Sequence, residues 1–342
     1  MKEADALMSI KSETFHTRSM DLTSELLQGA IDIHVHAGPH LNSSPRRADP
    51  FEAAEEARDV GMRAIVYMDV FSESCGTAWM VQRRVPDIEV YGGIILNSNY
   101  GGINPRAVKT ALNYGAGAKF VQFGTHTTHF MASREARMVD GKPVLLKDLY
   151  PKFMEEEFSR AIRIPLDSVT PEIDEILTLI ANSPGVYLNT GHVSGEEAIR
   201  LVDLAGTYGI KQVVIAEHAL GELSVEEQKA VAKKGAFLEH SMAQFIGAGA
   251  IPRTHYYVEP EYMYDVVLDV AKHRPNLRGL GDQIHEIGSE HFIFSSDYGV
   301  RALPTPVEGM RMGAACFLDM DFSTDEIRTM MCTNPAKLLS LE

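Results

Sequence analysis

Short runs of apolar residues recur along the chain and predict eight buried β-strands. They are rich in Val, Ile, Phe and Tyr, and several begin directly after a Gly or Pro, as strands often do. Because few of their positions alternate with polar ones, they predict strands covered on both faces, as in a parallel sheet. The runs are Ala30–His36, Arg63–Asp69, Glu89–Leu96, Ala118–Gly124, Gly185–Gly191, Gln212–His218, Ala236–His240 and His291–Asp297.

The segments between these runs carry helix-start signals and helical spacing of apolar residues. Asp49–Val60 and Asn104–Tyr114 begin with Asp-Pro and Asn-Pro, a favourable N-cap followed by proline in the first turn. Thr170–Asn182 begins Thr-Pro-Glu, whereas Ser194–Tyr208 and Ser224–Lys234 begin with a serine and resemble capping boxes. The chain therefore alternates strands with helices.

This alternation predicts an α/β fold, a (β/α)8 TIM barrel. An open doubly wound sheet is the alternative, but Ala37–His40 is not the glycine-rich phosphate loop expected after its first strand. Two connections are long enough to be lids or subunit contacts, residues 126–169 after the fourth strand and 243–290 after the seventh. The second should hold helices around Glu261–Lys272 and Asp282–Ile287. We expect an N-terminal extension over residues 1–29 and a single domain over 30–342.

The first strand carries two histidines in the sequence Ile31-Asp32-Ile33-His34-Val35-His36. Alternate residues of a strand share a face, so His34 and His36 are expected to point the same way, within reach of one metal ion. Histidine is a common ligand of zinc and similar divalent metals. An isolated His-x-His is weak evidence for a metal site, so its weight depends on the other strand ends.

Later strands end in the remaining ligands of a metal site. In a barrel, the carboxyl ends of the strands build the active site. A metal ligand or a general acid or base stands at these ends, namely His192 after the fifth strand, Glu217 and His218 after the sixth, Glu239 and His240 after the seventh, and Asp297 after the eighth. A single terminal histidine is usually structural, but several strand ends in this order favour a metal centre.

Composition narrows the class of protein without identifying a function. The 342 residues are 45% hydrophobic and 23% charged, which is ordinary for a globular protein. The net charge of −15 argues against nucleic-acid binding, which needs a basic surface. The three cysteines are far apart, the first 29 residues lack a secretory signal, and no apolar run is long enough to span a membrane. We therefore expect a cytoplasmic protein without a membrane partner.

The strand-end residues resemble the signature of the amidohydrolase superfamily of metal-dependent hydrolases. The resemblance covers Gly29 to Leu339, including the tail Cys332–Leu339, which is similar to the closing helix of those proteins. It is strongest to a poorly characterised group through Ile31–Pro39, Gly92–Gly102 and Ser295–Gly299. By position, the resemblance implies that His34, His36, His192, His218 and Asp297 are the metal ligands.

One departure from the superfamily concerns the number of ions. Many members bridge two metals with a carboxylated lysine or a glutamate at the end of strand four, but Lys119 stands near the start of that strand. Met68 also occupies a position near the end of strand two where relatives are expected to have a lysine. Asp69 and Glu239 are the best substitute acidic ligands. One ion is therefore favoured over two, and Zn2+ is the first candidate, with Mn2+ and Fe2+ as alternatives.

The expected chemistry is hydrolysis by water that a metal ion activates. Asp297 is predicted to accept the proton of that water and to pass it to the leaving group. His218 is predicted to bind metal or to polarise the substrate, with Glu239 or His240 orienting either. Because neighbours on a strand face opposite ways, only one residue of each pair Glu217/His218 and Glu239/His240 should point inward, and His218 and Glu239 are favoured.

The substrate is expected to be a small amide, lactone or ester, carboxylated or neutral. Arginine suits a carboxylate or phosphate because it can donate two parallel hydrogen bonds. Candidate substrate-binding residues follow the strands at His40, Arg46, Asn97, Asn99, His126 and Arg301. A metal-dependent lyase, such as a decarboxylase or hydratase, would use the same residues. A non-catalytic binding barrel is a third interpretation, and a homo-oligomer built through the long insertions is a further expectation.

Overall fold

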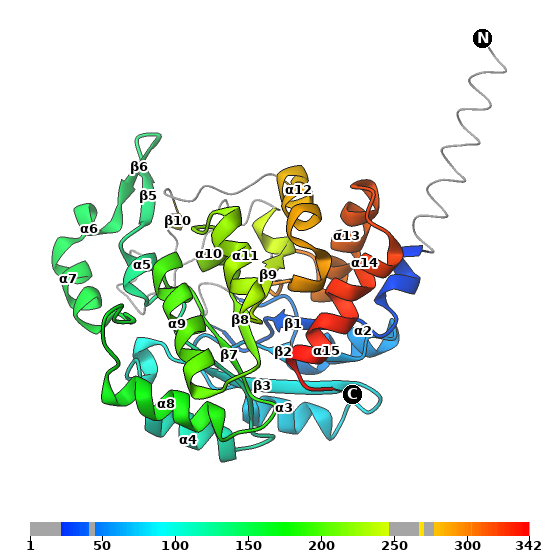
Figure 1. Cartoon of the computed structure of the whole chain (residues 1–342), viewed down its shortest axis with the longest axis horizontal. Coiled ribbons are helices and arrows are strands. Elements are labelled where there is room, and N and C mark those ends of the chain that lie inside the picture. The colour runs from blue at the N-terminus through cyan, green and yellow to red at the C-terminus, as the bar shows by residue number, and fades with distance from the viewer. Residues whose placement is uncertain (1–21, 41–44, 246–266, 270–276, 302, 342) are drawn as a thin grey trace, which may run out of the picture.

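The computed structural model describes residues 22–40, 45–245, 267–269, 277–301 and 303–341 (Figure 1). Parallel strands form an eight-stranded sheet in the order β1-β2-β3-β4-β7-β8-β9-β11. All eight predicted strands are present; seven are shorter than their apolar runs, and β9 is shifted by one residue. They are β1 (Ile31–Val35), β2 (Ala64–Tyr67), β3 (Glu89–Ile95), β4 (Ala118–Gln122), β7 (Tyr187–Asn189), β8 (Val213–Ile215), β9 (Phe237–Ser241) and β11 (Phe292–Ser295).

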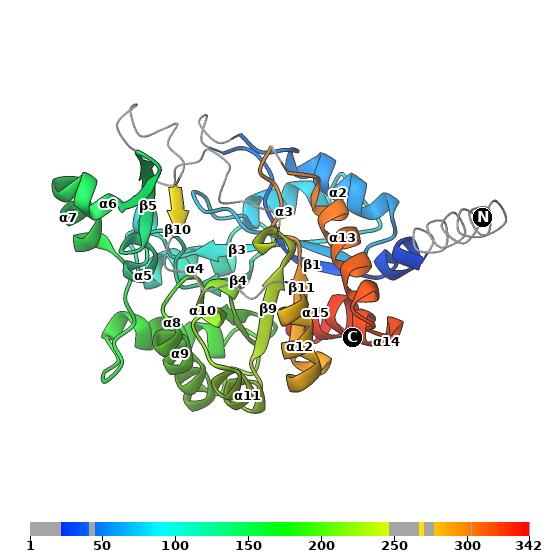
Figure 2. The same cartoon turned by 90° about the horizontal axis from the view of Figure 1, so that it is seen from above.

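The sheet curls until its first and last strands meet. Val35 at the end of β1 forms a parallel bridge with Tyr298, which follows β11. The backbone N–H of His36 donates to the carbonyl of Tyr298 at 2.9 Å, and that of Asp297 donates to the carbonyl of His34 at 3.0 Å. The (β/α)8 barrel predicted from the sequence is therefore confirmed, and Figure 2 shows helices surrounding its strands.

Helices follow most strands, at the positions where capping signals predict them. Asp49 caps the first of them, while Ser194 and Ser224 form capping boxes with the glutamates at the third helical position. The helices around the barrel are α2 (Pro50–Asp59), α3 (Cys75–Gln82), α4 (Pro105–Asn113), α8 (Pro171–Ala181), α9 (Gly195–Tyr208), α11 (Val225–Lys233), α12 (Leu277–Ile287), α13 (Pro306–Asp319), α14 (Thr324–Arg328) and α15 (Asn334–Leu338). Among the described helices, none combines the length and hydropathy of a membrane span.

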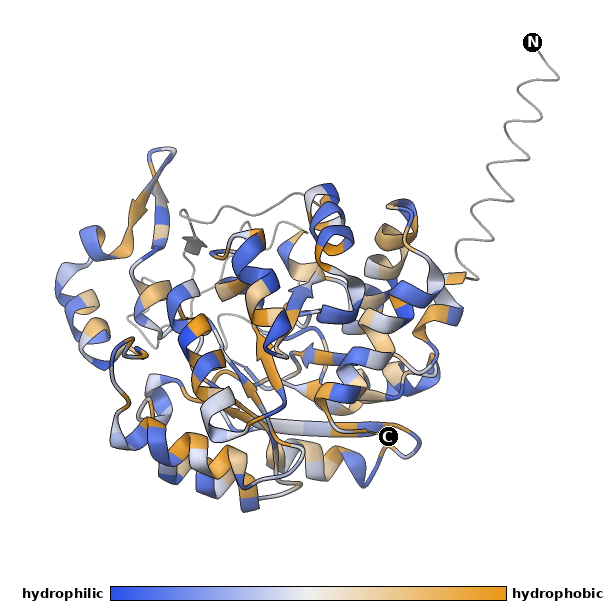
Figure 3. Ribbon diagram, viewed as in Figure 1, coloured by the Kyte–Doolittle hydropathy of each residue, from blue (hydrophilic) through white to orange (hydrophobic). Residues whose placement is uncertain are grey.

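Two layers of apolar side chains hold the barrel together. The larger lies between strands and helices, and Leu26 and Leu27 from the end of the N-terminal extension pack into it. The smaller gathers side chains from seven different strands, which can meet only inside a closed barrel. Leu338 of α15 joins this interior cluster, so the C-terminal helix closes one end of the barrel. Figure 3 shows the corresponding hydrophobic colouring along the strands.

The first long insertion contains secondary structure that the sequence did not predict. It holds the hairpin of β5 (Glu135–Val139) and β6 (Lys142–Leu145), with α5 (His129–Ala132), α6 (Leu146–Leu149) and α7 (Pro151–Arg160). The hairpin, α6 and α7 lie together at one side of the barrel in Figures 1 and 2. The insertion therefore forms a small subdomain.

The second insertion pairs with the first. Residues 267–269 form β10 (Val267–Asp269), which lies antiparallel to β5 in a three-stranded sheet of order β10-β5-β6. The prediction of a helix around Glu261–Lys272 is therefore wrong at residues 267–269. Backbone pairing with β5 overrides the local helical pattern there. The other residues of that expected helix lie outside the described ranges. The helix expected at Asp282–Ile287 is present as part of α12.

Candidate metal centre and pocket

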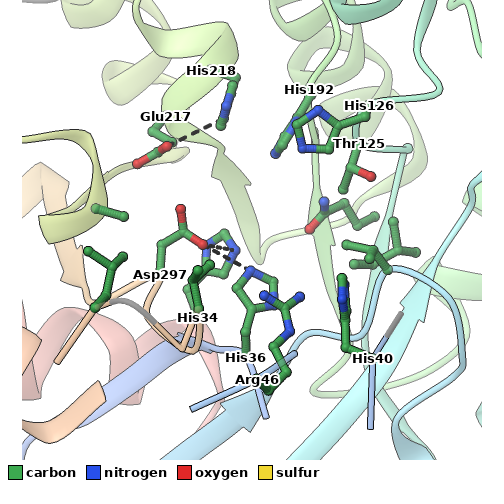
Figure 4. A pocket seen from close by; sticks show the side chains of 16 residues that line it. His34, His36, His40, Arg46, Thr125, His126, His192, Glu217, His218 and Asp297 are labelled. Atoms are coloured by element: carbon green, nitrogen blue, oxygen red, sulfur yellow. Dashed lines mark ion pairs between the residues drawn. The ribbon is translucent and has the colours of Figure 1, made fainter. Parts of the chain in front are cut away.

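A pocket opens at the carboxyl ends of the barrel strands (Figure 4). Its empty space is about 810 Å³ when the open mouth is included. Ile95 belongs both to the interior cluster and to the pocket wall, so the pocket lies directly above the apolar interior. The polar lining consists of His34, His36, His40, Arg46, Gln122, Thr125, His126, His192, Glu217, His218 and Asp297.

His34, His36 and Asp297 converge on one point of this pocket. Their ligand atoms all lie within 4.8 Å of one another. Nε2 of His36 is 2.9 Å from Oδ1 of Asp297, and Nε2 of His34 is 3.3 Å from the same oxygen. The structure thus brings together three predicted metal ligands that lie near opposite ends of the barrel domain in the sequence.

The far nitrogens of the two imidazoles are held by neighbouring groups. Nδ1 of His34 is 2.9 Å from Oε1 of Glu239, which also accepts a hydrogen bond from the hydroxyl of Ser295 at 2.8 Å. Nδ1 of His36 is 2.6 Å from the carbonyl oxygen of Met68. Such partners fix the ring orientation and direct Nε2 toward a metal. Met68 thus serves the site through its backbone, where relatives were expected to offer a lysine side chain.

The two carboxylates beside His34 favour a positive charge at that ring, whereas the surroundings of His36 do not. Burial alone would lower the pKa of His34, but the carboxylates of Asp297 and Glu239 outweigh it and raise that pKa to about 10. Burial, assisted by the charge of Arg46, lowers the pKa of His36 to about 4. Against its own burial, Asp297 has a pKa held well below its usual range by the two histidines. The carboxylate of Asp297 is therefore anionic and suited to bind a cation.

Backbone geometry places the end of β1 and the segment after β11 close together. Asp297 has φ +50°, a left-handed conformation that aspartate tolerates better than most residues. At Gly299 (φ +152°), an added Cβ would lie 1.8 Å from the carbonyl oxygen of His36. Only glycine therefore allows the chain after β11 to run against the end of β1.

A second group of histidines lies across the pocket, as Figure 4 shows. His192 follows β7, and its ring stacks on that of His218 with centroids 3.6 Å apart. His126 meets His192 edge-on at 5.4 Å, and its Nδ1 is 2.8 Å from Oε1 of the buried Glu135 in β5. His192 and His218 are outside the compact group of His34, His36 and Asp297. Their role as metal ligands stays a prediction.

The expectation that only one of Glu217 and His218 points inward is wrong. β8 ends at Ile215, and the two residues begin the short helix α10 (Glu217–Leu220), where strand alternation no longer applies. Both line the pocket. Glu217 accepts a hydrogen bond from the hydroxyl of Ser241, and its Oε1 is 3.4 Å from Nδ1 of His218.

The pair Glu239 and His240 does alternate, because β9 continues through both residues. Glu239 is fully buried and holds His34, as described above. His240 lies outside the pocket lining and stacks on Phe292 with ring centroids 5.7 Å apart. The structure therefore places Glu239 behind the metal group and His240 away from the pocket.

The predicted substrate-binding residues divide into two sets. His40, Arg46 and His126 line the pocket. The other three, Asn97, Asn99 and Arg301, do not. Asn97 is buried and donates to Thr125 and to the carbonyl of Val70, Asn99 donates to the carbonyl of Phe71, and Arg301 is exposed.

Neither Asp69 nor Lys119 is in the pocket wall. Asp69 accepts hydrogen bonds from the backbone of Phe71 and Ser72 in the turn after β2. Lys119 lies near the start of β4, with its ammonium 4.9 Å from the ring centroid of Tyr91. At the end of β4, the buried amide of Gln122 lines the pocket instead. This strand thus offers a neutral group where a bridge would stand.

Sequence reasoning missed several residues of the wall. Gln122 and Thr125 were overlooked because neither is a charged or imidazole group at a strand end. The apolar wall consists of Ile95 at the end of β3 and of residues that follow strands in segments without a motif, Val70, Ala243, Val300 and Leu303.

The donor set fits a divalent transition metal. Two imidazole nitrogens and one carboxylate oxygen converge, with both far nitrogens engaged, as in metal sites that keep positions open for water or substrate. His34, His36 and Asp297 are therefore the residues that would hold the ion.

The model of one protein family, described as a family of unknown function (DUF6282), matches residues 29–239. This is more than half of the 342-residue chain. The chain belongs to this family. The matched part of the DUF6282 domain contains β1 with its two histidines and ends at Glu239, before the segment that carries Asp297.

Solved structures are similar to the DUF6282 barrel in fold. It matches an organophosphorus hydrolase from Deinococcus radiodurans with 13% identity and a TM-score of 0.52, over 91% of this chain and 92% of the other. An amidohydrolase from Pseudomonas aeruginosa matches with 12% identity and a TM-score of 0.50, over 94% and 98%. A candidate 2-pyrone-4,6-dicarboxylic acid hydrolase from Pseudomonas putida matches with 14% identity and a TM-score of 0.50, over 92% and 98%.

At these identities each match shows that the chain shares the barrel fold of these proteins. The sequence has no match among curated proteins.

Proposed function

We propose that this protein is a metal-dependent hydrolase with one divalent ion, Zn2+ in the first place, held by His34, His36 and Asp297. The observation that carries the proposal is the convergence of these three side chains in a pocket at the carboxyl ends of the barrel strands. When bound, such an ion would supply Lewis-acid polarisation of the substrate and a lowered pKa of water. Hydrolysis is also the reaction given in the names of two fold neighbours.

The chain's own residues would supply proton transfer, orientation of a metal ligand and contacts to the substrate. Asp297 faces the pocket as an anion, so it can hold the proton of the attacking water and return it to the leaving group. Glu239 keeps Nδ1 of His34 engaged and so fixes the ring. His126, oriented by Glu135, and His218 stand on the opposite wall, where they can hydrogen-bond to a substrate.

The pocket supports a small amide, lactone or ester substrate with an anionic group. Arg46 lines the pocket, and its charge reaches His36 and Asp69. A guanidinium at this place suits a carboxylate on the substrate. A decarboxylase or hydratase would use the same residues, so only the identity of the products separates a hydrolase from a lyase.

Two measurements test the proposal. Elemental analysis of protein purified without chelator should find about one equivalent of transition metal per chain, as expected for a site with three protein ligands and an open position. The His34→Ala variant should lose that ion. The holoprotein should then be assayed on paired lactones, esters and amides with and without a carboxylate, with detection of released CO2. Absence of metal after reconstitution with Zn2+ and Mn2+ would refute the proposal, and CO2 release without bond hydrolysis would replace hydrolase by lyase.

A further inference from the structure

The pairing of β1 with β2 contains an irregularity next to the metal group. Asp32 pairs with Ile65, whereas Val35 pairs with Tyr67. Two residues of β1, Ile33 and His34, therefore stand opposite one residue of β2. This is a β-bulge, which inserts one extra residue into a strand and redirects the side chains that follow.

The bulge decides which face of the strand carries the histidines. Ile31 and Ile33 belong to the cluster inside the barrel. Strict alternation would then send Val35 inside and His34 and His36 outward. Instead, Val35 packs into the outer layer between strands and helices, while both histidines line the pocket. The extra residue thus moves the histidines from the helix side to the pocket.

Asp32 holds this arrangement through one oxygen. Its Oδ1 accepts the backbone N–H of His34 at 3.0 Å, the first amide of the altered register. The same oxygen accepts the backbone N–H of Ser296 at 3.1 Å, in the segment that leads from β11 to Asp297. The hydroxyl of Ser296 also donates to the carbonyl of His34 at 3.3 Å. One carboxylate oxygen therefore ties together the two segments that carry the metal group.

The buried carboxylate of Asp32 has an energetic cost that a purely structural role would not require. It is 1% exposed, and its Oδ2 accepts no hydrogen bond from any residue that the structure describes. Burying a carboxylate with one oxygen unsatisfied is unfavourable. We propose that Asp32 is a positioning residue of the metal site, which holds the β1 bulge and sets His34 against Asp297. This inference rests on the proposed function, since it assumes that the group binds a metal.

The test compares Asp32→Asn with Asp32→Ala in the full-length protein. Asparagine keeps an oxygen acceptor at the same place, whereas alanine removes it. Zn2+ affinity is measured by competition with a chromophoric chelator, and the ligand geometry by the visible absorption of the Co2+-substituted protein. We expect a Kd near wild type for Asp32→Asn, and a Kd about 10- to 100-fold weaker with an altered Co2+ spectrum for Asp32→Ala, as for other residues that orient metal ligands.

Glu73→Ala is the matched control for the loss of backbone hydrogen bonds. Its carboxylate accepts the N–H groups of Cys75 and Gly76, as Asp32 accepts two, but it lies outside the pocket wall. It should leave the Zn2+ affinity unchanged even where it lowers the melting temperature. If Asp32→Ala does not fold, Asp32→Ser tests the same tie, because its shorter side chain can keep the local bond to the N–H two residues on but gives up the bond to Ser296, and it should weaken Zn2+ binding several-fold.

The outcomes separate the two proposals. Wild-type affinity in folded Asp32→Ala, or in Asp32→Ser when the former does not fold, overturns the positioning role and leaves the proposed function standing. Equal loss in Asp32→Asn and Asp32→Ala also overturns it, because charge rather than the retained oxygen would then matter. Failure of the wild-type protein to bind Zn2+ or Co2+ overturns the proposed function and the inference with it.

Discussion

At the scale of single residues, Asp297 depends on its neighbours for both position and charge. Its backbone is left-handed, its N–H is bound to the carbonyl of His34, and its carboxylate is 2.9 Å from His36. The sequence predicted the three residues of the metal group from their places at strand ends. It could not predict that Gln122 takes the bridging position, because no charge marks it.

Asp297→Asn should abolish most turnover while leaving the fold intact. Asparagine has nearly the same shape and tolerates φ +50° as well, but it cannot hold the proton of an attacking water. General acid–base catalysis contributes about 10²- to 10⁴-fold, so kcat should fall by that order. The measurement is steady-state hydrolysis of a substrate identified in the paired assay. Asp321→Asn is the control, because Asp321 is also left-handed (φ +63°) but exposed; wild-type turnover in Asp297→Asn would remove Asp297 as the base.

Glu239→Gln should weaken metal binding without removing a ligand. The fully buried carboxylate of Glu239 accepts from Nδ1 of His34 and from Ser295, and an amide cannot stabilise the ring in the same way. Loss of such a partner costs about 10- to 100-fold in metal affinity. Chelator competition measures the effect. Glu290→Gln, which alters a surface carboxylate 3.8 Å from His291, should change nothing, and equal Kd values for the two variants would contradict the assigned role of Glu239.

At the scale of elements, apolar runs predicted the barrel strands well because each buries both faces. They did not predict the hairpin of β5 and β6, whose β6 strand is half exposed, or β10, which depends on a partner far away in the chain. The bulge in β1 was equally invisible, since the sequence shows alternation but not pairing. The orientation of Glu217 was predicted wrongly because the apolar pattern alone does not show where β8 ends.

The capping boxes predict measurable contributions to stability. The hydroxyl of Ser194 accepts the N–H of Glu197 at 3.3 Å, while the Glu197 carboxylate accepts the N–H of Ser194 at 2.8 Å. Ser194→Ala should therefore lower the free energy of unfolding by about 1 kcal/mol. Urea denaturation followed by circular dichroism measures it. Ser224→Ala, in the equivalent box of α11, should cost a similar amount, and no change in either variant would show that these caps are not stabilising.

At the scale of the whole molecule, the proposed ion would connect the first and last strands of the barrel. His34 and His36 belong to the end of β1, and Asp297 follows β11, so their shared ligand would lie across the closure of the sheet. A ligand that binds only the folded state stabilises it by mass action. The predicted homo-oligomer, cytoplasmic location and single-domain organisation stay predictions.

Removal of the metal should lower the melting temperature. At a free ion concentration 100 times Kd, binding adds about 2.7 kcal/mol to the free energy of unfolding. For a domain of about 310 residues, 1 kcal/mol corresponds to a shift of roughly 1.5 °C, so chelation should lower the melting temperature by roughly 4 °C. Scanning calorimetry with and without chelator measures it. His34→Ala should no longer respond to chelator, and an unchanged wild-type melting temperature would place the ion elsewhere or nowhere.

The pairing of β10 with β5 has a consequence for any attempt to exchange specificity between relatives. Glu135, which holds His126 at the pocket wall, lies opposite Asp269 in that pairing, so the backbone of one insertion supports a pocket contact of the other. In a chimera that received only residues 126–169 from a relative, the new hairpin would have to pair with the β10 strand of the recipient protein. Grafting should therefore succeed when both insertions are transplanted together and fail when either is moved alone.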